Sequence, residues 1–399
     1  MTNSGLSSGA YGDVLPSANE SVNPQPELTS GTAPTANPFA TPEDLQLGEV
    51  LAAQKIHPVI LFGGQTTGKT VLLFSLLAYG FENSNARMRV TLGTPVHDTS
   101  TDNGQNSANM AQSLFDYHLE RWRESIGNER TSGGAFFVPV DVTVSLDDGT
   151  ELSQKFAFLD WTGENFLRNN TRPESPGGIS RGQRSPIMKP IEAVGRSVLS
   201  HFSKNISVLF LAPVFNLSNA KDEEDAAKII RNQKETAKRL LIGVEQYEAH
   251  RASRARLDNL IFLINKWDCL HPPGSPGFKA PSESMLEDEL NRRYSDAWTQ
   301  FKTIRGVTDQ QRSKMQYSSG EHDGEDRRMK YDDDIAAKEQ VARYARTLWN
   351  WLFINTCGQP AFADVMPPPR PPQPPAPPPP PPPRPPSMVE VGMRWLNRL

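Results

Sequence analysis

Cysteine, excess basic charge and long apolar runs are all scarce in this sequence. Cys269 and Cys357 are the only cysteines, which argues against a disulfide-built secreted protein and favours a reducing compartment. A net charge of −4 gives no reason to expect nucleic acid as a partner. The first residues lack the basic start and apolar core of a signal peptide, and no apolar run is long enough to cross a bilayer. We therefore expect a soluble, cytoplasmic protein.

The two ends of the chain are poor in residues that could build a core. Residues 1–45 are rich in Ser, Asn, Gly, Pro and Thr, and we expect them to be disordered. In the segment 361–399, 16 of the 20 residues from Pro367 to Pro386 are proline. This stretch predicts polyproline II and could span roughly 60 Å at about 3.1 Å per residue. It is either a linker or a ligand for the aromatic groove of a partner, and Met388–Leu399 could be a docking peptide.

Residues 46–360 remain as the globular domain, and its most specific motif is a phosphate-binding loop. Val59–Phe62 reads as a buried strand and Lys69–Tyr79 as a helix. The segment between them fits G-x-x-x-x-G-K-[ST], whose backbone N–H groups surround an anion at the start of a helix. Lys69 is expected to reach the terminal phosphates, and the Thr70 hydroxyl to bind Mg²⁺. The predicted loop consists of Gly63, Gly64, Gln65, Thr66, Thr67, Gly68, Lys69 and Thr70.

A second acidic motif follows a predicted hairpin. Val138, Val140, Val142, Val144 and Leu146 alternate with polar or small residues, and an Asp-Asp-Gly-Thr turn leads into a partner strand over Leu152–Asp160. Asp160, at the end of this strand, can hold Mg²⁺ through water, and the N–H of Gly163 can contact a γ-phosphate. Asp-x-x-Gly alone also describes many surface turns, so its place in the chain carries the prediction.

Further buried strands and helices are expected downstream. The segments are a helix over Ile191–Phe202, a strand over Ile206–Val214, a helix over Lys221–Tyr247, a strand over Leu260–Ile264, a helix over Glu283–Thr303, a short strand over Met315–Tyr317 and a closing helix over Ala336–Phe353. The charged side of the Lys221–Tyr247 helix is interpreted as a solvated face. Residues 320–334 are charged and expected to be exposed.

The strand over Leu260–Ile264 leads into Asn265, Lys266 and Asp268. The Asp268 carboxylate can accept hydrogen bonds from N1–H and the exocyclic amine of guanine, a pair of donors that adenine lacks. Asn265 can bind the base and brace the phosphate loop, while the Lys266 stem can lie along the base plane. Backbone N–H groups of Ser318 and Ser319 could meet the guanine O6, although Ser-Ser-Gly is a common loop.

Taken in order, these motifs resemble those of the P-loop GTPases of the Ras-like and translation-factor branch, over about residues 55–356. The resemblance implies a P-loop NTPase fold of the α/β class, with a mostly parallel sheet, one antiparallel hairpin and helices on both faces. It further implies GTP/GDP binding, Mg²⁺ and a switch that acts on a protein partner. The length of the chain and its tails are also similar to the double-GTPase proteins of bacterial defence operons, although this sequence contains one phosphate loop.

Two features depart from the Ras-like pattern. The chain between Lys69 and Asp160 is long, which implies helical insertions near 94–130, 165–200 and 270–312 and leaves two candidates, Thr131 and the weaker Thr94, for the threonine that closes on Mg²⁺. Gln65 replaces the usual glycine, and Glu164 replaces the usual catalytic glutamine.

These departures leave three functions open. A slowly hydrolysing GTPase switch is favoured, with Lys69, Gln65 and Glu164 acting at the phosphates, and with a partner or one of Arg168, Arg172, Arg181 and Arg184 supplying a further charge. A catalytically weak GTP-binding scaffold is the alternative. An ATPase of another P-loop branch is disfavoured by Asn265–Asp268.

Overall fold

The computed structural model describes the chain in several ranges. They are residues 42–64, 67–82, 87–96, 136–160, 202–217, 220–251, 257–279, 281–319 and 334–364, with scattered residues between 108 and 120 and short pieces at 198–199, 322–323 and 328–329. Both predicted tails lie almost wholly outside these ranges. Of the helices within the described ranges, none is long and apolar enough to cross a membrane.

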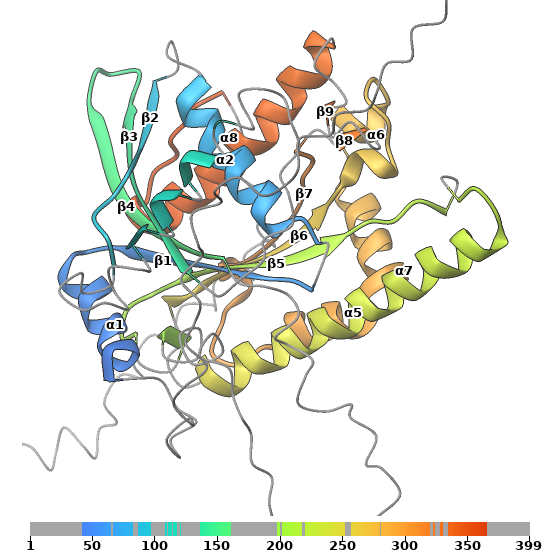
Figure 1. Cartoon of the computed structure of the whole chain (residues 1–399), viewed down its shortest axis with the longest axis horizontal. Coiled ribbons are helices and arrows are strands. Elements are labelled where there is room, and N and C mark those ends of the chain that lie inside the picture. The colour runs from blue at the N-terminus through green and yellow to red at the C-terminus, as the bar shows by residue number, and fades with distance from the viewer. Residues whose placement is uncertain are drawn as a thin grey trace, which may run out of the picture. The chain divides into compact units, whose positions relative to one another are not determined.

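Seven strands form the central sheet, in the order β2-β3-β4-β1-β5-β6-β7 (Figure 1). Six of them run parallel, and β3 pairs antiparallel with both of its neighbours. The hairpin β3–β4 has the turn that its Asp-Asp-Gly-Thr sequence predicts. The strands are β1 (His57–Phe62), β2 (Met88–Leu92), β3 (Phe136–Ser145), β4 (Glu151–Asp160), β5 (Ser207–Pro213), β6 (Asn259–Asn265) and β7 (Arg312–Gln316).

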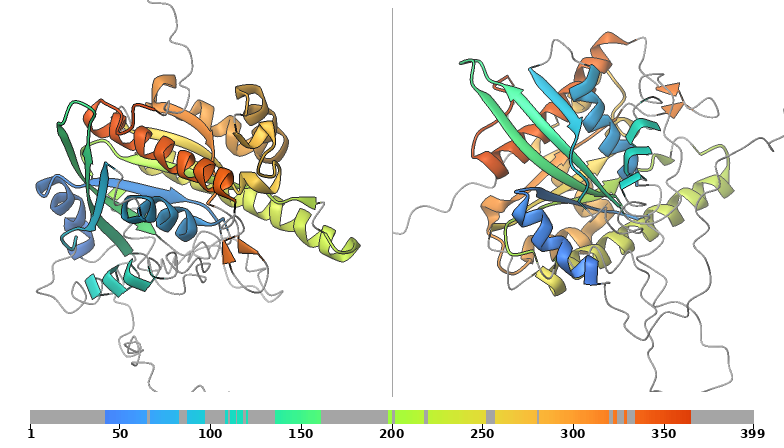
Figure 2. Two further views of the ribbon diagram at one scale, coloured as in Figure 1. Left: turned by 90° about the horizontal axis from the view of Figure 1, so that it is seen from above. Right: turned by 60° about the vertical axis from the view of Figure 1, so that its left-hand side comes forward.

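Helices cover both faces of this sheet (Figures 1 and 2). On one face lie α2 (Lys69–Glu82) and α8 (Ile335–Cys357), and on the other lie α1 (Pro42–Ala53), α5 (Glu223–Arg251) and α7 (Glu283–Thr303). The short α6 (Pro276–Lys279) follows β6. The first half of α5 reaches beyond the sheet in both figures, and its first buried residue is Thr236.

Aromatic side chains fill the space between the sheet and each helical layer. Phe210 lies at the centre of one layer, stacked with Phe62 and Phe262 and edge-on to Tyr247 of α5 and Phe301 of α7. In the other layer, Phe156 and Phe158 of β4 contact Trp349 of α8. The Trp349 indole N–H donates to the Leu76 carbonyl of α2 at 3.0 Å, so the two helices on this face are joined through a buried polar contact as well.

The predicted fold class is confirmed: the protein is a mixed α/β structure with a mostly parallel sheet, an antiparallel hairpin and helices on both faces. The predicted strand over Met315–Tyr317 is wrong in its limits, since β7 begins at Arg312. Ion pairs of two largely buried cations with exposed carboxylates account for the difference: Lys314 reaches Glu287 at 2.7 Å and Arg312 reaches Asp309 at 2.7 Å, so charged residues can occupy this strand. Two short strands, β8 (His322–Asp323) and β9 (Arg328–Met329), pair within the charged segment where no strand was predicted. The predicted domain limits and insertions stay predictions.

Candidate functional site

The predicted phosphate loop lies between the end of β1 and the start of α2. Lys69 is buried, and its ammonium donates to the carbonyl oxygens of Gly63 and Gly64, both at 2.9 Å. The Thr67 hydroxyl donates to the same Gly64 carbonyl at 3.0 Å. The loop therefore folds around its own lysine, which holds the positive charge at the strand–helix junction. Gln65 and Thr66 lie outside the described residues.

Glycine is required at two positions of the loop. Gly68 has φ +80°, and a Cβ placed on it would lie 2.8 Å from the amide nitrogen of Asn265. A Cβ on Gly63 would lie 2.6 Å from the Thr67 hydroxyl oxygen. These close approaches explain why positions 63 and 68 of the motif need residues without side chains.

Asn265, the last residue of β6, joins the predicted base motif to the phosphate loop. Its amide nitrogen donates to the Thr67 carbonyl at 2.8 Å, and its amide oxygen accepts from the Lys266 N–H at 2.9 Å. Lys266 takes a left-handed conformation with φ 60°, which turns the chain sharply after the strand. The brace between Asn265 and the phosphate loop that the sequence predicts is thus present.

Asp268 and Ser318 lie together at the adjacent strand end. The Ser318 hydroxyl donates to a carboxylate oxygen of Asp268 at 2.5 Å, and both side chains are buried. Backbone bonds hold the two segments in register, since the Tyr317 N–H donates to the Ile264 carbonyl at 2.8 Å and the Trp267 N–H to the Tyr317 carbonyl at 3.1 Å. Ser319 follows directly and is half-buried. The structure therefore brings the loop, Asn265, Asp268 and Ser318 to one edge of the sheet.

Phe215 is a residue of this region that the sequence did not single out. The Lys266 ammonium lies 5.6 Å from the centre of the Phe215 ring, a cation–π arrangement that fixes the direction of the lysine stem. No motif marks Phe215, because the contact joins the loop after β5 to the loop after β6. The hydroxyl of Ser75 on α2 likewise lies 2.7 Å from that of Tyr317, which joins α2 to the segment after β7.

Two of the predicted magnesium ligands lie near the same edge. Thr70 is in the first turn of α2, and Asp160 is the last residue of β4, whose Leu159 is in register with Ile60 of β1. Among the described residues, no three His, Cys, Asp or Glu side chains cluster in a way that could hold a metal ion. Thr131, Gly163, Glu164 and the four arginines of 168–184 lie outside the described residues, while Thr94 is exposed after β2.

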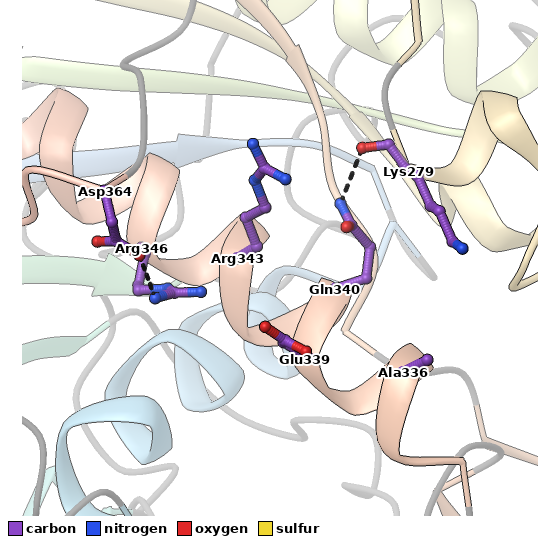
Figure 3. Close-up of a pocket in the computed structure, with 7 residues that line it drawn as sticks. All are labelled: Lys279, Ala336, Glu339, Gln340, Arg343, Arg346 and Asp364. Atoms are coloured by element: carbon purple, nitrogen blue, oxygen red, sulfur yellow. Dashed lines mark hydrogen bonds and ion pairs between the residues drawn. The ribbon is translucent and has the colours of Figure 1, made fainter.

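A separate hollow of about 370 Å³ lies along α8 (Figure 3). Within it, Arg346 pairs with Asp364 at 2.5 Å, and the Gln340 amide donates to the Lys279 carbonyl at 3.2 Å. Its lining contains none of the residues predicted to bind nucleotide. The lining residues are Lys279, Ala336, Glu339, Gln340, Arg343, Arg346 and Asp364.

Comparisons with known proteins add little to this geometry. No family model matches the sequence, and no curated protein does. Among solved structures, the chain is similar to one in the signal recognition particle receptor SRb-GTP/SRX complex from Chaetomium thermophilum, at 13% identity and a TM-score of 0.33. The match covers 68% of this chain and 93% of the other. A likeness this weak supports no conclusion about function.

Proposed function

We propose that this protein binds GTP with Mg²⁺ and hydrolyses it slowly, as a switch that controls a protein partner. The observation that carries the proposal is the 2.8 Å hydrogen bond from Asn265 to the Thr67 carbonyl. Asp268, a carboxylate suited to guanine, follows Asn265 by three residues, so this bond supports one nucleotide engaging both Asp268 and the loop. A phosphate loop alone would leave the base undetermined.

Each part of the site supports one part of the nucleotide. Asp268, oriented by the Ser318 hydroxyl, would accept the two donors of guanine. Lys69 and the loop N–H groups would hold the phosphates, and Thr70 with Asp160 would hold Mg²⁺, which neutralises phosphate charge during transfer. Gly163 would meet the γ-phosphate.

Calorimetric titration with GTP, ATP and XTP tests the binding proposal. We expect GTP to bind about ten- to hundredfold more tightly than ATP, because hydrogen bonds to a charged group contribute about 1.5–3 kcal/mol. Lys69→Ala should abolish binding, and Thr70→Ala should remove its dependence on Mg²⁺. Equal affinities for GTP and ATP would contradict guanine recognition, and unchanged titrations of the Lys69 variant would contradict the phosphate loop.

Single-turnover phosphate release tests hydrolysis. A glutamine after the Asp-x-x-Gly glycine can both donate to and accept from the attacking water, whereas the Glu164 carboxylate only accepts and its charge opposes the γ-phosphate. We expect slow hydrolysis by the isolated protein and faster hydrolysis by Glu164→Gln. Fast turnover by the wild type that is lost in Glu164→Gln would mean that Glu164 acts as a base.

The polyproline segment supports the partner part of the proposal. Deletion of residues 367–399 should leave GTP affinity and Tm unchanged, since no predicted core element is removed. Binding to an isolated SH3 or WW domain, compared before and after deletion, tests whether the segment is a ligand. A large fall in Tm would contradict its assignment as a tail.

A further inference from the structure

A cationic side chain of α5 lies directly against the phosphate loop. A Cβ placed on Gly64 would lie 2.7 Å from Cδ and 3.5 Å from Cβ of Arg239, so the arginine stem covers the Gly64 backbone. The Arg239 side chain is only 18% exposed. Because the Lys69 ammonium bonds to the Gly64 carbonyl, two cationic side chains meet at this one residue. The sequence predicts a solvated face for the charged side of α5, and at Arg239 that prediction is wrong.

Close packing fixes the position of Arg239. One turn further along α5, a Cβ placed on Gly243 would lie 3.0 Å from Cδ1 of Phe62, the last residue of β1. The helix α5 therefore packs against the end of β1 at Gly243 and against the predicted phosphate loop at Arg239. Leu240, between them, is fully buried. The backbone that carries Arg239 belongs to a rigid part of the fold, which is what a precise ligand contact requires.

The guanidinium of Arg239 has a weak partner. Its Nε donates to a carboxylate oxygen of Glu235, one turn earlier, at 3.1 Å, and the Glu235 side chain is 44% exposed. No other hydrogen bond of this guanidinium is found within the described ranges. Exposed pairs of this kind contribute little to stability, whereas a phosphate group offers a planar guanidinium several acceptor oxygens at once. Arg239 can therefore exchange Glu235 for a phosphate at small cost.

The order of the strands identifies which phosphate lies near Arg239. The predicted base contacts, Asn265 and Asp268, follow β6, and Ser318 follows β7. Gly64 follows β1, which lies two strands away from β6 and beside β4 with its Asp160. A nucleotide whose base lies at β6 and β7 would extend its phosphates toward β1. Its terminal phosphate is thus at the end where Gly64 and Arg239 meet.

We infer that Arg239 binds the terminal phosphate of the nucleotide and sets the preference for triphosphate over diphosphate. This inference rests on the proposed function and adds a residue that belongs to none of the sequence motifs. With a diphosphate bound, Arg239 stays paired with Glu235. With a triphosphate bound, the guanidinium transfers to the γ-phosphate and Glu235 is released.

The test is to measure the Kd of GDP and of a non-hydrolysable GTP analogue for the wild type and Arg239→Gln. We expect Arg239→Gln to weaken the analogue about ten- to hundredfold, the range for a lost hydrogen bond to a charged group, and to leave GDP unchanged. Lys238→Gln, which removes the neighbouring exposed charge of the same helix, is the matched control and should change neither affinity.

The Kd values of the Glu235→Gln variant provide a second test, in which Arg239 is kept. Removal of the competing carboxylate should strengthen the analogue about two- to fivefold, because exposed pairs contribute about 0.2–1 kcal/mol. This inference would be overturned if Arg239→Gln weakened the binding of GDP and of the analogue equally, or changed neither affinity, and Glu235→Gln had no effect. The proposed function would then stand. If the wild type bound neither nucleotide, both would be overturned.

Discussion

The Arg251 guanidinium lies 2.7 Å from the Asp258 carboxylate, and neither side chain has any exposed surface. Asp258 also accepts from the Tyr247 hydroxyl at 2.8 Å and from the Ile206 N–H at 3.0 Å. Arg251 in turn donates to the carbonyls of Phe202 and Lys204. This network joins the end of α5 to the starts of β5 and β6, at the end of the sheet opposite the predicted nucleotide site.

Replacement of Arg251 by methionine should therefore destabilise the fold strongly. The variant leaves the Asp258 charge buried without its cation, which typically costs about 3–5 kcal/mol. Chemical denaturation measures the loss. Arg305→Met is the matched control. The Arg305 side chain is 87% exposed and makes a long ion pair of 3.8 Å with Glu248, so its removal should change stability by less than about 1 kcal/mol. Similar effects of the two variants would contradict the structural importance of the buried pair.

Asn265→Ala should weaken nucleotide binding and lower stability together. The variant leaves the buried Thr67 carbonyl without its donor, which costs about 1–3 kcal/mol, and releases the phosphate loop from β6. Thermal unfolding and titration with GTP measure the two effects. Asn259→Ala, at the opposite end of the same strand, removes only an exposed 3.3 Å contact with the Leu257 carbonyl. That control should leave GTP affinity unchanged, and an equal loss in both variants would exclude a specific brace.

Asp268→Asn should change the preferred base. An asparagine amide cannot accept from both donors of guanine, but its nitrogen can donate to the C2 oxygen of xanthine. We expect GTP affinity to fall about ten- to hundredfold and XTP affinity to rise, as measured by competition binding. Ser318→Ala, which removes the 2.5 Å partner of Asp268, should weaken GTP without favouring XTP. Equal GTP affinity in the wild type and Asp268→Asn would remove Asp268 from the site.

His57 should make the fold less stable in acid. Its ring nitrogen lies 2.9 Å from the Ser207 hydroxyl between β1 and β5, and burial lowers the pKa of His57 to about 3. In the unfolded chain the pKa of this histidine is roughly the free value of 6.5, so below that pH the unfolded state binds a proton that the folded state does not. Stability is therefore lost as the pH falls from about 6.5 toward 3. This residue should contribute a loss of about 2 kcal/mol between about pH 7.5 and pH 5.

Denaturation of the wild type and His57→Gln at the two pH values measures this contribution. Glutamine does not titrate but keeps a polar group beside Ser207, so the variant should lose less stability in acid. An identical loss in both proteins would show that other groups control the acid response.

The sequence predicted those features that are encoded locally. The strand, glycine-containing loop and helix from β1 to α2 form a continuous segment with a required glycine pattern, and the β3–β4 hairpin follows from strict alternation and its turn residues. The contact from Asn265 to the loop was predicted because Asn265 belongs to a short motif at the end of a strand, and the structure contains this contact although β5 lies between β1 and β6. Each of these depends on residues close together in the chain or on the ends of strands whose order a motif implies.

Other features depend on contacts that no local pattern encodes. Arg239 belongs to a charged helix, and only the packing of Gly243 on Phe62 turns this arginine toward Gly64. Lys314 lies in a strand although it is charged, because its ion-pair partners Glu283 and Glu287 lie on α7. The Ser75–Tyr317 hydroxyl pair joins positions 242 residues apart. Composition and periodicity carry no information about such pairs.

The bond from Trp349 to the Leu76 carbonyl has a consequence for the order in which the protein can be completed during translation. The two residues are 273 positions apart, and Trp349 also covers Phe156 and Phe158. α2 is synthesised early and can pack on β2, but its contact with α8 forms only when α8 has left the ribosome. Until then it exposes apolar surface that a chaperone could bind. The last helix of the domain thus completes the packing of α2 against the sheet.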